Sequence, residues 1–251
     1  MATVAQINIT PVKGLGLLHP DEVELTAVGV AENRRFYLVT ADRGLLFNGK
    51  DYGPLVRVSP ELSGDRLELH FPDGTVVGGE IELGHDVTTN FWGRPVNGRV
   101  VQGPWSTALS EFTGDAVLLV RTEESGDGSD VCVGTLIARA SCERLAQELG
   151  APVDPRRFRM LLELDGLDAH EEDTWDGRVV RAGDAVLIAR GPVPRCAVTT
   201  QDPDSGEVNL DTVRAIKDYR GLRNRKAIDF GIYFDVEQPG RVRVGDAVEL
   251  V

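Results

Sequence analysis

Cysteine is scarce in this chain: its 251 residues include only three cysteines, and no two of them are spaced as Cys-x-x-Cys. Because Cys132, Cys142 and Cys196 are odd in number and well separated, the sequence indicates neither a disulfide framework nor a structural zinc site. We interpret Cys142 as a packing residue of a helix face. Three thiolates cannot supply the four ligands of an ordinary iron–sulfur cluster. We therefore expect no iron–sulfur cluster in this chain, and electrons for any redox chemistry would come from another protein.

Long hydrophobic runs and an excess of basic residues are also absent. No apolar run approaches the roughly 20 residues that a membrane-spanning helix needs, and residues 1–7 lack the basic and apolar regions of a secretory signal. We expect no transmembrane segment and a cytoplasmic location. The 27 Lys and Arg residues are outnumbered by 40 Asp and Glu residues, which gives a formal net charge of −13. Nucleic acid is therefore not an expected partner, and an anionic small molecule would need a local group of basic residues.

The sequence contains instead many short segments typical of strands. Between residues 55 and 101 such segments alternate with turns, as in a small barrel or sandwich. We interpret residues 91–93 as a strand end with a core aromatic residue and assign them no chemistry. The polar, glycine-rich segment 123–130 indicates a mobile loop or a connection between two lobes. The turns lie at 63–65, 72–74 and 97–98.

Helical patterns are fewer and short. The spacing of apolar residues predicts helices over 105–112, 142–149 and 210–220. Ser106 and Ser141 are the expected N-caps of the first two, because a serine hydroxyl can accept from a free amide of the first turn. The sequence thus predicts an α+β fold that is mainly β.

The stretch 191–206 contains the most distinctive cysteine. Two prolines spaced one residue apart stiffen the approach to Cys196, and the neighbouring Arg195 favours a thiolate. Residues 197–200 predict a short strand, and residues 202–206 predict a turn. A thiol on a stiff loop can bind a soft metal. Free cysteine is also among the most buried residue types, and on these residues alone inert burial is the favoured interpretation.

The segment from Pro194 to Gly206 reads Pro-Arg-Cys-x-x-Thr-Thr-x-Asp-Pro-Asp-Ser-Gly. It resembles the cysteine motif of MOSC-domain proteins, especially the amidoxime-reducing component branch and its bacterial relatives. Matching segments flank it over nearly the whole chain. The resemblance implies a small N-terminal β-barrel-like lobe over 1–115, packed on a C-terminal MOSC β-barrel over 116–251 with a few short helices. It also implies that Cys196 is a ligand to molybdenum in a molybdopterin cofactor, which reverses the preference for burial.

The resemblance implies further residues beside the cofactor. Lys13 lies in a Pro-Val-Lys-Gly segment that is similar to the family's Pro-(Val/Ile)-Lys-Ser motif, with Gly14 in place of serine. Arg34 matches an arginine on the cofactor phosphate, and Leu161 stands where the family has an asparagine. The implied cofactor-binding set is Lys13, Gly14, Arg34, Ala140, Ser141, Arg157, Arg159, Leu161, Pro194, Arg195 and Tyr233, with Cys196 as catalytic residue and metal ligand.

Taken without the resemblance, several of these residues have other roles open to them. Lys13 would be a solvated loop lysine, and Arg34 an exposed arginine at a strand start. Arg157 and Arg159 alternate on a predicted strand, so they would share a face and form a two-pronged anion clamp. A structural ion pair with the acidic segment 171–173 is the competing explanation.

The function implied by the resemblance is the reduction of N-hydroxylated compounds, such as amidoximes and hydroxylamines, by a molybdenum-cofactor-dependent oxidoreductase. Its partners would be a small-molecule substrate and an electron donor of the ferredoxin, flavodoxin or cytochrome type. Pyridoxal phosphate binding is a further family-level association. The alternative is a sulfur carrier or sulfurtransferase that holds a persulfide on Cys196 without molybdenum, which Gly14 and Leu161 slightly favour. A third possibility is a non-catalytic cofactor carrier or insertion partner.

Overall fold

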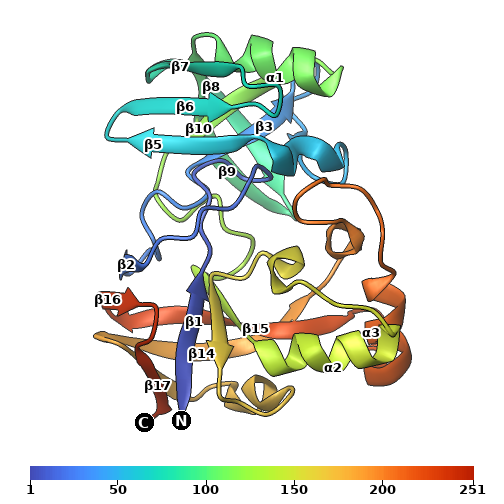
Figure 1. Cartoon of the computed structure of the whole chain (residues 1–251). Coiled ribbons are helices and arrows are strands. Elements are labelled where there is room, and N and C mark those ends of the chain that lie inside the picture. The colour runs from blue at the N-terminus through green and yellow to red at the C-terminus, as the bar shows by residue number, and fades with distance from the viewer.

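Short strands joined by turns build two lobes, one above the other in Figure 1. The computed structural model describes the whole chain, residues 1–251. Three α-helices accompany the strands: α1 (Trp105–Thr113), α2 (Arg139–Leu149) and α3 (Thr212–Arg220). The predicted α+β fold that is mainly β is confirmed.

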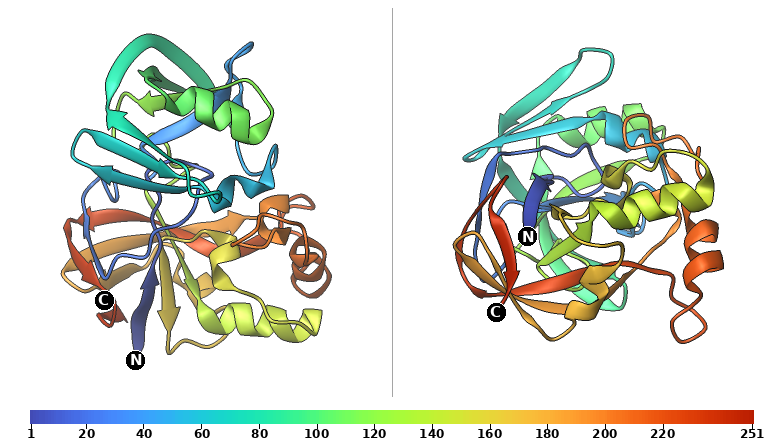
Figure 2. Two further views of the ribbon diagram at one scale, coloured as in Figure 1. Left: turned by 45° about the horizontal axis from the view of Figure 1, so that its top comes forward. Right: turned by 60° about the horizontal axis from the view of Figure 1, so that its bottom comes forward.

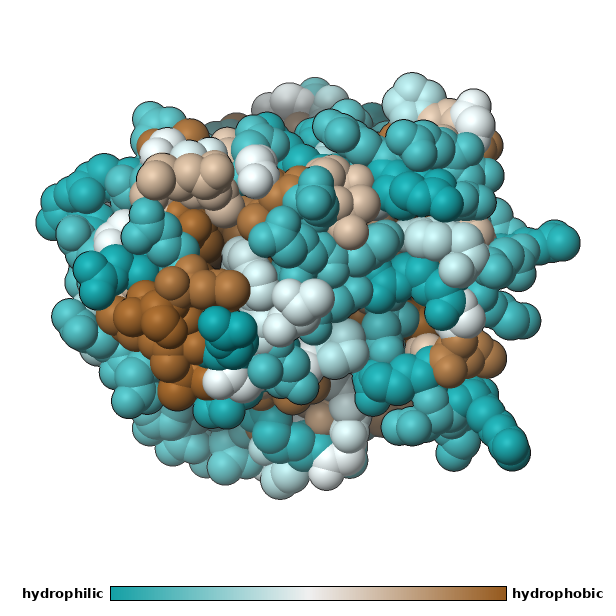
Figure 3. Space-filling view, turned by 90° about the horizontal axis from the view of Figure 1, so that it is seen from below, coloured by the Kyte–Doolittle hydropathy of each residue, from teal (hydrophilic) through white to brown (hydrophobic).

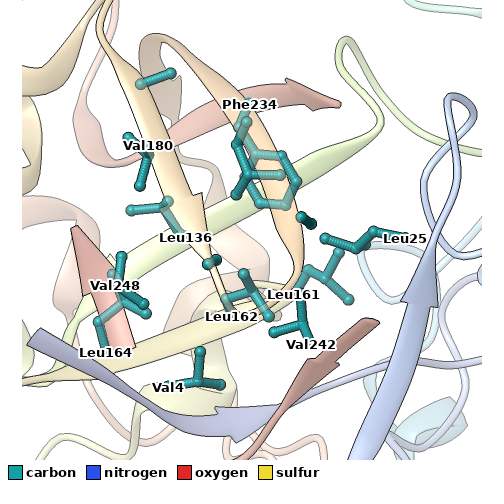
Figure 4. Close-up of a cluster of buried hydrophobic side chains, with 14 of the residues drawn as sticks. Val4, Leu25, Leu136, Leu161, Leu162, Leu164, Val180, Phe234, Val242 and Val248 are labelled. Atoms are coloured by element: carbon teal, nitrogen blue, oxygen red, sulfur yellow. The ribbon is translucent and has the colours of Figure 1, made fainter. Parts of the chain in front are cut away.

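Seven strands close into a barrel in the lower lobe. Neighbouring strands are antiparallel except β11 and β12, which pair in parallel. Apolar side chains fill the interior around Phe234 (Figure 4). Gly134 is required there, because an added Cβ would lie 2.1 Å from the Phe234 ring. In order round the barrel the strands are β1 (Ala2–Ile7), β12 (Leu162–Asp165), β11 (Gly134–Ala138), β15 (Asp229–Gln238), β14 (Ala185–Pro194), β13 (Val179–Ala182) and β17 (Ala247–Leu250).

The upper lobe consists of two sheets around one core, rather than a single closed barrel. The core includes Trp105 of α1, whose Nε1 donates to the carbonyl of Leu67 at 3.2 Å. The five-stranded sheet is β4 (Leu46–Phe47), β3 (Phe36–Thr40), β10 (Val117–Thr122), β9 (Arg94–Gln102) and β8 (Glu82–Phe91). The three-stranded sheet is β5 (Ser59–Ser63), β6 (Arg66–His70) and β7 (Val76–Glu80). A 3₁₀-helix, η1 (Gly53–Arg57), precedes β5.

The two lobes exchange segments, so they do not divide in space at residue 115. Strand β1 is the first in the chain, yet it pairs with β12 and β17 of the lower barrel. Strand β10 follows residue 115 but pairs with β3 and β9 of the upper sheet. A two-stranded ribbon joins β2 (Glu22–Leu25) to β16 (Gly240–Arg243). The chain therefore crosses between the lobes several times, as Figures 1 and 2 show.

The surface seen from below is mostly hydrophilic, with a compact apolar area on the left and smaller apolar areas elsewhere (Figure 3). Exposed apolar side chains at the two ends of the chain are Met1, Leu250 and Val251. None of the helices is long and apolar enough to cross a membrane.

The predicted strand over residues 197–200 is wrong, because this segment is a 3₁₀-helix, η4 (Ala197–Thr200). The hydroxyls of Thr199 and Thr200 donate to the carbonyls of Cys196 and Ala197 at 3.1 and 2.7 Å. Threonine hydroxyls that bond to nearby carbonyls stabilise a tight turn in place of an extended strand. The predicted turn over 202–206 is present, with Asp202 Oδ1 accepting from the amides of residues 204 and 205.

The strand expected around Arg157 and Arg159 is also wrong. Residues Pro155–Phe158 form a 3₁₀-helix, η2, whose N-cap Asp154 accepts from the amide of Arg156. Arg159 ends it in the left-handed region, with φ of 52°. The two arginines therefore do not alternate along a strand.

Two expected N-caps have other roles. The hydroxyl of Ser106 accepts from the amide of Leu119 in β10. Helix α2 begins at Arg139, so Ser141 lies inside its first turn, and its hydroxyl donates to Glu172 of η3 (Glu171–Trp175). In both cases a partner from elsewhere in the fold replaces the local amide.

Candidate functional site

A pocket open to solvent on one side lies where segments of both lobes meet. It encloses about 1020 Å³ of space, including open solvent. The upper lobe contributes residues 48–50, 56 and 92, and the segments around η2, η4 and β14 contribute the opposite wall. The structure brings nine of the sequence-predicted residues into its lining: Lys13, Gly14, Arg34, Arg157, Arg159, Pro194, Arg195, Cys196 and Tyr233.

Three of the sequence-predicted residues do not line this pocket. Ala140 is half-buried in the first turn of α2. Ser141 is fully buried, and its hydroxyl accepts from the amide of His170 and donates to Glu172, both at 2.8 Å. Leu161 is buried in the core of the barrel (Figure 4). The amide of Leu161 donates to the hydroxyl of Thr135, which lines the pocket. A role for these three residues beside a cofactor stays a prediction.

The thiol of Cys196 is exposed at the end of β14. Cys196 is the N-cap residue of η4, and the amide of Arg195 donates to the carbonyl of Ile228 at 2.7 Å, which fixes the approach. Burial keeps the pKa of Cys142 well above its ordinary value, and that thiol packs in a core cluster as predicted. Of these two cysteines, Cys196 is exposed and lines the pocket, whereas Cys142 is buried away from it.

Arg195 is held beneath the pocket by neighbours that carry no negative charge. Its guanidinium donates to the carbonyl of Phe158 and to Met160 Sδ, and lies 5.2 Å from the centroid of the Phe158 ring. Burial lowers the pKa of Arg195 to about 10. Its Nε is buried without a hydrogen-bond partner. The guanidinium therefore has hydrogen-bonding capacity that the protein itself leaves unused.

A second group of charges gathers around Asp130. Lys13 Nζ donates to Asp130 Oδ1 at 2.7 Å and to the carbonyl of Gly128 at 2.9 Å. Arg34 Nη1 lies 4.0 Å from Asp130 Oδ2. Burial lowers the pKa of Lys13 to about 8. Burial alone would raise the pKa of Asp130, but Lys13 and Arg34 together hold it well below its ordinary value. The carboxylate is therefore ionised and compensates only part of the positive charge.

Arg159 and Arg157 behave differently, so they do not form the expected two-pronged clamp. Arg159 donates to the carbonyl of Leu15 at 2.6 Å and forms no ion pair. Burial, with Arg34 nearby, lowers its pKa to about 9. Arg157 instead donates to the carbonyl of Gln201 and to Asn209 Oδ1, both at 2.7 Å, and so fastens the segment after Cys196.

The competing explanation for these two arginines is also wrong. In the acidic segment 171–173, Asp173 pairs with Arg220 and Glu172 accepts from Ser141. The partners of Arg157 and Arg159 lie elsewhere, and neither arginine pairs with the segment.

The pocket is strongly basic although the protein is acidic. Its lining contains six basic residues and a single carboxylate, that of Asp130. A local excess of cations on a protein of net charge −13 favours a bound anion. The six basic residues are Lys13, Arg34, Lys50, Arg157, Arg159 and Arg195.

Sequence reasoning missed several lining residues. Asp130 and Cys132 lie just before β11, and the polar segment that leads to them was read only as a loop. Burial, with Asp235 nearby, raises the pKa of Cys132 to about 11, so this thiol is protonated. Trp92 lies at a hairpin tip, where a bulky aromatic residue ahead of a glycine was the available signal.

Comparison with known proteins identifies the family. The family model of the MOSC N-terminal beta barrel domain matches residues 1–115, and that of the MOSC domain matches residues 125–249. The chain belongs to the MOSC-domain family. The resemblance seen in the sequence of this MOSC protein is thereby confirmed.

Named relatives of this MOSC protein span its whole length. Mitochondrial amidoxime-reducing component 1 of Homo sapiens is 27% identical over 285 residues, which cover 100% of this chain and 83% of that protein. Molybdenum cofactor sulfurase of Caenorhabditis briggsae is 26% identical over 267 residues, which cover 99% of this chain and 36% of that protein. Among solved structures, YuaD of Bacillus subtilis aligns over 100% of this chain and 96% of its own, with 12% identity and a TM-score of 0.47. The cytoplasmic location and the association with pyridoxal phosphate stay predictions.

Proposed function

We propose that this MOSC protein is a molybdenum-cofactor-dependent oxidoreductase that reduces N-hydroxylated compounds such as amidoximes and hydroxylamines. One observation carries the proposal: an exposed thiol, that of Cys196, lies in a pocket with six basic side chains and one carboxylate. Soft sulfur ligands suit molybdenum, and the anionic tail of a molybdopterin suits the basic lining. The names of the relatives point the same way.

The residues present fit such a cofactor. Cys196 would bind the metal, while Lys13, Arg34 and Arg159 would hold the anionic tail. Arg159 forms no ion pair, and the buried Nε of Arg195 has no partner, so both retain capacity for a ligand. Gly14 and Leu161 offer no hydroxyl or amide at the two positions where the family pattern has them. Backbone and arginine contacts would therefore carry more of the binding here.

When bound, the cofactor would supply the two-electron chemistry. An amidoxime takes up two electrons and two protons, its N–O bond breaks, and an amidine and water are released. Because this chain contains no electron carrier of its own among its side chains, the electrons would come from a ferredoxin-, flavodoxin- or cytochrome-type protein. The residues of the pocket would bind and orient the cofactor and the substrate, with Arg195 next to Cys196 in the lining.

The test is metal analysis and reductase assay of protein purified from a host that makes the cofactor. We expect about stoichiometric molybdenum and conversion of benzamidoxime to benzamidine with a reduced viologen as donor. Cys196→Ala should lose both metal and activity. Cys132→Ala is the matched control, because its protonated thiol is a poor ligand, and it should keep both. Full turnover by Cys196→Ala would refute the proposal.

The second candidate function is sulfur transfer by a Cys196 persulfide without molybdenum. The observations that favour it are the exposed thiol and the two departures, Gly14 and Leu161. Intact-mass analysis separates the candidates: an added sulfur atom on Cys196 in protein that lacks molybdenum supports transfer. A protein that retains the cofactor but converts no N-hydroxylated compound would instead be a cofactor carrier.

A further inference from the structure

Trp92 is an exposed aromatic residue at the tip of the hairpin formed by β8 and β9. Phe91 pairs with Arg94, so Trp92 and Gly93 form a two-residue turn. Both have positive φ, 54° for Trp92 and 96° for Gly93. Glycine and asparagine are the usual residues at the first of these positions, and a bulky side chain there is uncommon. Backbone strain of this kind is often found at functional sites.

Packing of the hairpin does not explain this residue. Phe91 supplies the buried aromatic anchor and packs edge-on against Tyr37, with ring centroids 5.0 Å apart. The side chain of Trp92 is instead 58% exposed, and it lines the pocket that contains Cys196. The hairpin therefore holds the indole ring of Trp92 in the pocket, although this ring does not contribute to the hairpin's hydrophobic core.

A hydrogen bond fixes one edge of the Trp92 indole, and a lysine covers one of its faces. Trp92 Nε1 donates to Asp130 Oδ1 at 3.1 Å. Lys50 Nζ lies 4.6 Å from the ring centroid, which is a cation–π distance. Lys50 is exposed, so another planar or cationic group can take its place on the ring face. Asp130 is already paired with Lys13 and Arg34, so the face of Trp92 is the part of this corner left for a ligand.

We propose that Trp92 is the aromatic platform on which the planar N–C–N group of an amidoxime or amidine stacks, with Lys50 displaced. The assignment rests on the proposed function and narrows its substrates to planar, preferably aromatic, amidoximes. The other five basic residues suit an anionic ligand and would repel an amidinium. The face of Trp92 suits a planar amidine group, because an indole face stacks on planar groups and attracts cations.

The chain offers a direct probe of this site. It has three tryptophans, and Trp105 and Trp175 are 0% and 2% exposed, so a ligand that reaches the pocket changes mainly the emission of Trp92. We expect benzamidine and benzamidoxime to quench the fluorescence of the metal-free protein with saturation, and benzyl alcohol to do so much more weakly. By calorimetry, Trp92→Ala should weaken benzamidine binding at least tenfold, and Trp92→Phe by less than about threefold. Lys50→Ala should tighten it, because a competitor for the ring face is removed.

Two outcomes would overturn the assignment. One is unchanged benzamidine affinity in a folded Trp92→Ala protein, with folding checked by thermal unfolding. The other is quenching of Trp92 by a free pterin but not by benzamidoxime, which would make the ring a cofactor contact. The binding assay uses no metal, so its result does not depend on the proposed function. If benzamidine binds but the metal-loaded protein has no reductase activity, the proposed reaction is refuted and the amidine site stands. If Trp92→Ala leaves the reductase activity on benzamidoxime unchanged, the role of Trp92 is refuted and the proposed reaction stands.

Discussion

Two regions of the molecule contain buried charged side chains, and they differ in whether the protein supplies an opposite charge for each. Behind the barrel wall, Arg220 pairs with Asp173 and also contacts the His170 ring, while Ser141 bonds to Glu172. Each cation in that network faces a protein partner. In the pocket, by contrast, basic residues outnumber carboxylates six to one.

The difference separates structural charge from functional charge. A buried ion pair with both partners supplied by the chain is already satisfied, and removing one partner leaves the other uncompensated. A buried guanidinium that has only carbonyl partners, such as that of Arg159, keeps its charge uncompensated in the ligand-free protein. The cost of that arrangement is repaid only when an anion binds.

The largest expected effect is at Arg159. Arg159→Met should weaken retention of the anionic cofactor by about 2–5 kcal/mol, the range seen when one member of a desolvated charge pair is truncated. It should not lower the stability of the ligand-free protein, because the charge that it removes has no carboxylate partner. Cofactor content after gel filtration and denaturant unfolding of the metal-free protein measure the two effects.

Arg220→Met is the matched control for that experiment, because it removes a cation from the paired network. It should destabilise the protein by roughly 1–3 kcal/mol while leaving cofactor content unchanged. Equal losses of stability in Arg159→Met and Arg220→Met would contradict the distinction between structural and functional charge.

Glu172 gives the next largest effect, through pH. Burial raises its pKa to about 7, and one of its carboxylate oxygens, Oε2, has no partner. The folded state therefore binds a proton that the unfolded state releases near pH 4.5, so this residue makes stability fall as pH rises from about 4.5 to about 7. Glu172→Gln should be more stable than the wild type at pH 8, by up to roughly 3 kcal/mol, and equally stable near pH 4.5.

Denaturant unfolding of both proteins across this range checks the prediction at Glu172. Comparing the two cancels the opposite effect of His170, whose pKa is lowered to about 4 by burial and by Arg220. A stability difference that does not change with pH would contradict the assignment of the shift to Glu172.

Local features of the fold were predictable from the sequence. Gly114 and Gly150 end α1 and α2 in the left-handed region, and the turn after η4 follows from its Asp, Pro and Gly residues. The loop of Cys196 was found because proline, arginine and cysteine stand next to one another in the chain. In each of these cases the deciding contacts lie within a few residues.

The errors arise where distant segments decide the outcome. Ser141 was predicted to cap a helix, but a carboxylate 31 positions later, that of Glu172, accepts from its hydroxyl. The side chain of Leu161 packs in the barrel core, and no local pattern in the sequence indicated that position. Asp130 and Trp92 meet in the pocket from segments 38 positions apart, and neither carries a local motif for that contact. A single sequence contains no direct information on such pairs.

The smallest expected effect is at Arg157, which lies in the pocket lining but has structural partners. Its guanidinium donates to Gln201 and Asn209, and it thereby fastens the segment that follows Cys196. A lysine keeps the charge but cannot reach both partners with one planar fork, so Arg157→Lys should cost about 1–2 kcal/mol of stability. It should retain nearly all of the cofactor, in contrast with Arg159→Lys, whose shorter reach leaves the anion weakly held. Loss of the cofactor by Arg157→Lys, with unfolding at the wild-type denaturant concentration, would contradict this prediction. Arg157 would then be a ligand-binding residue like Arg159.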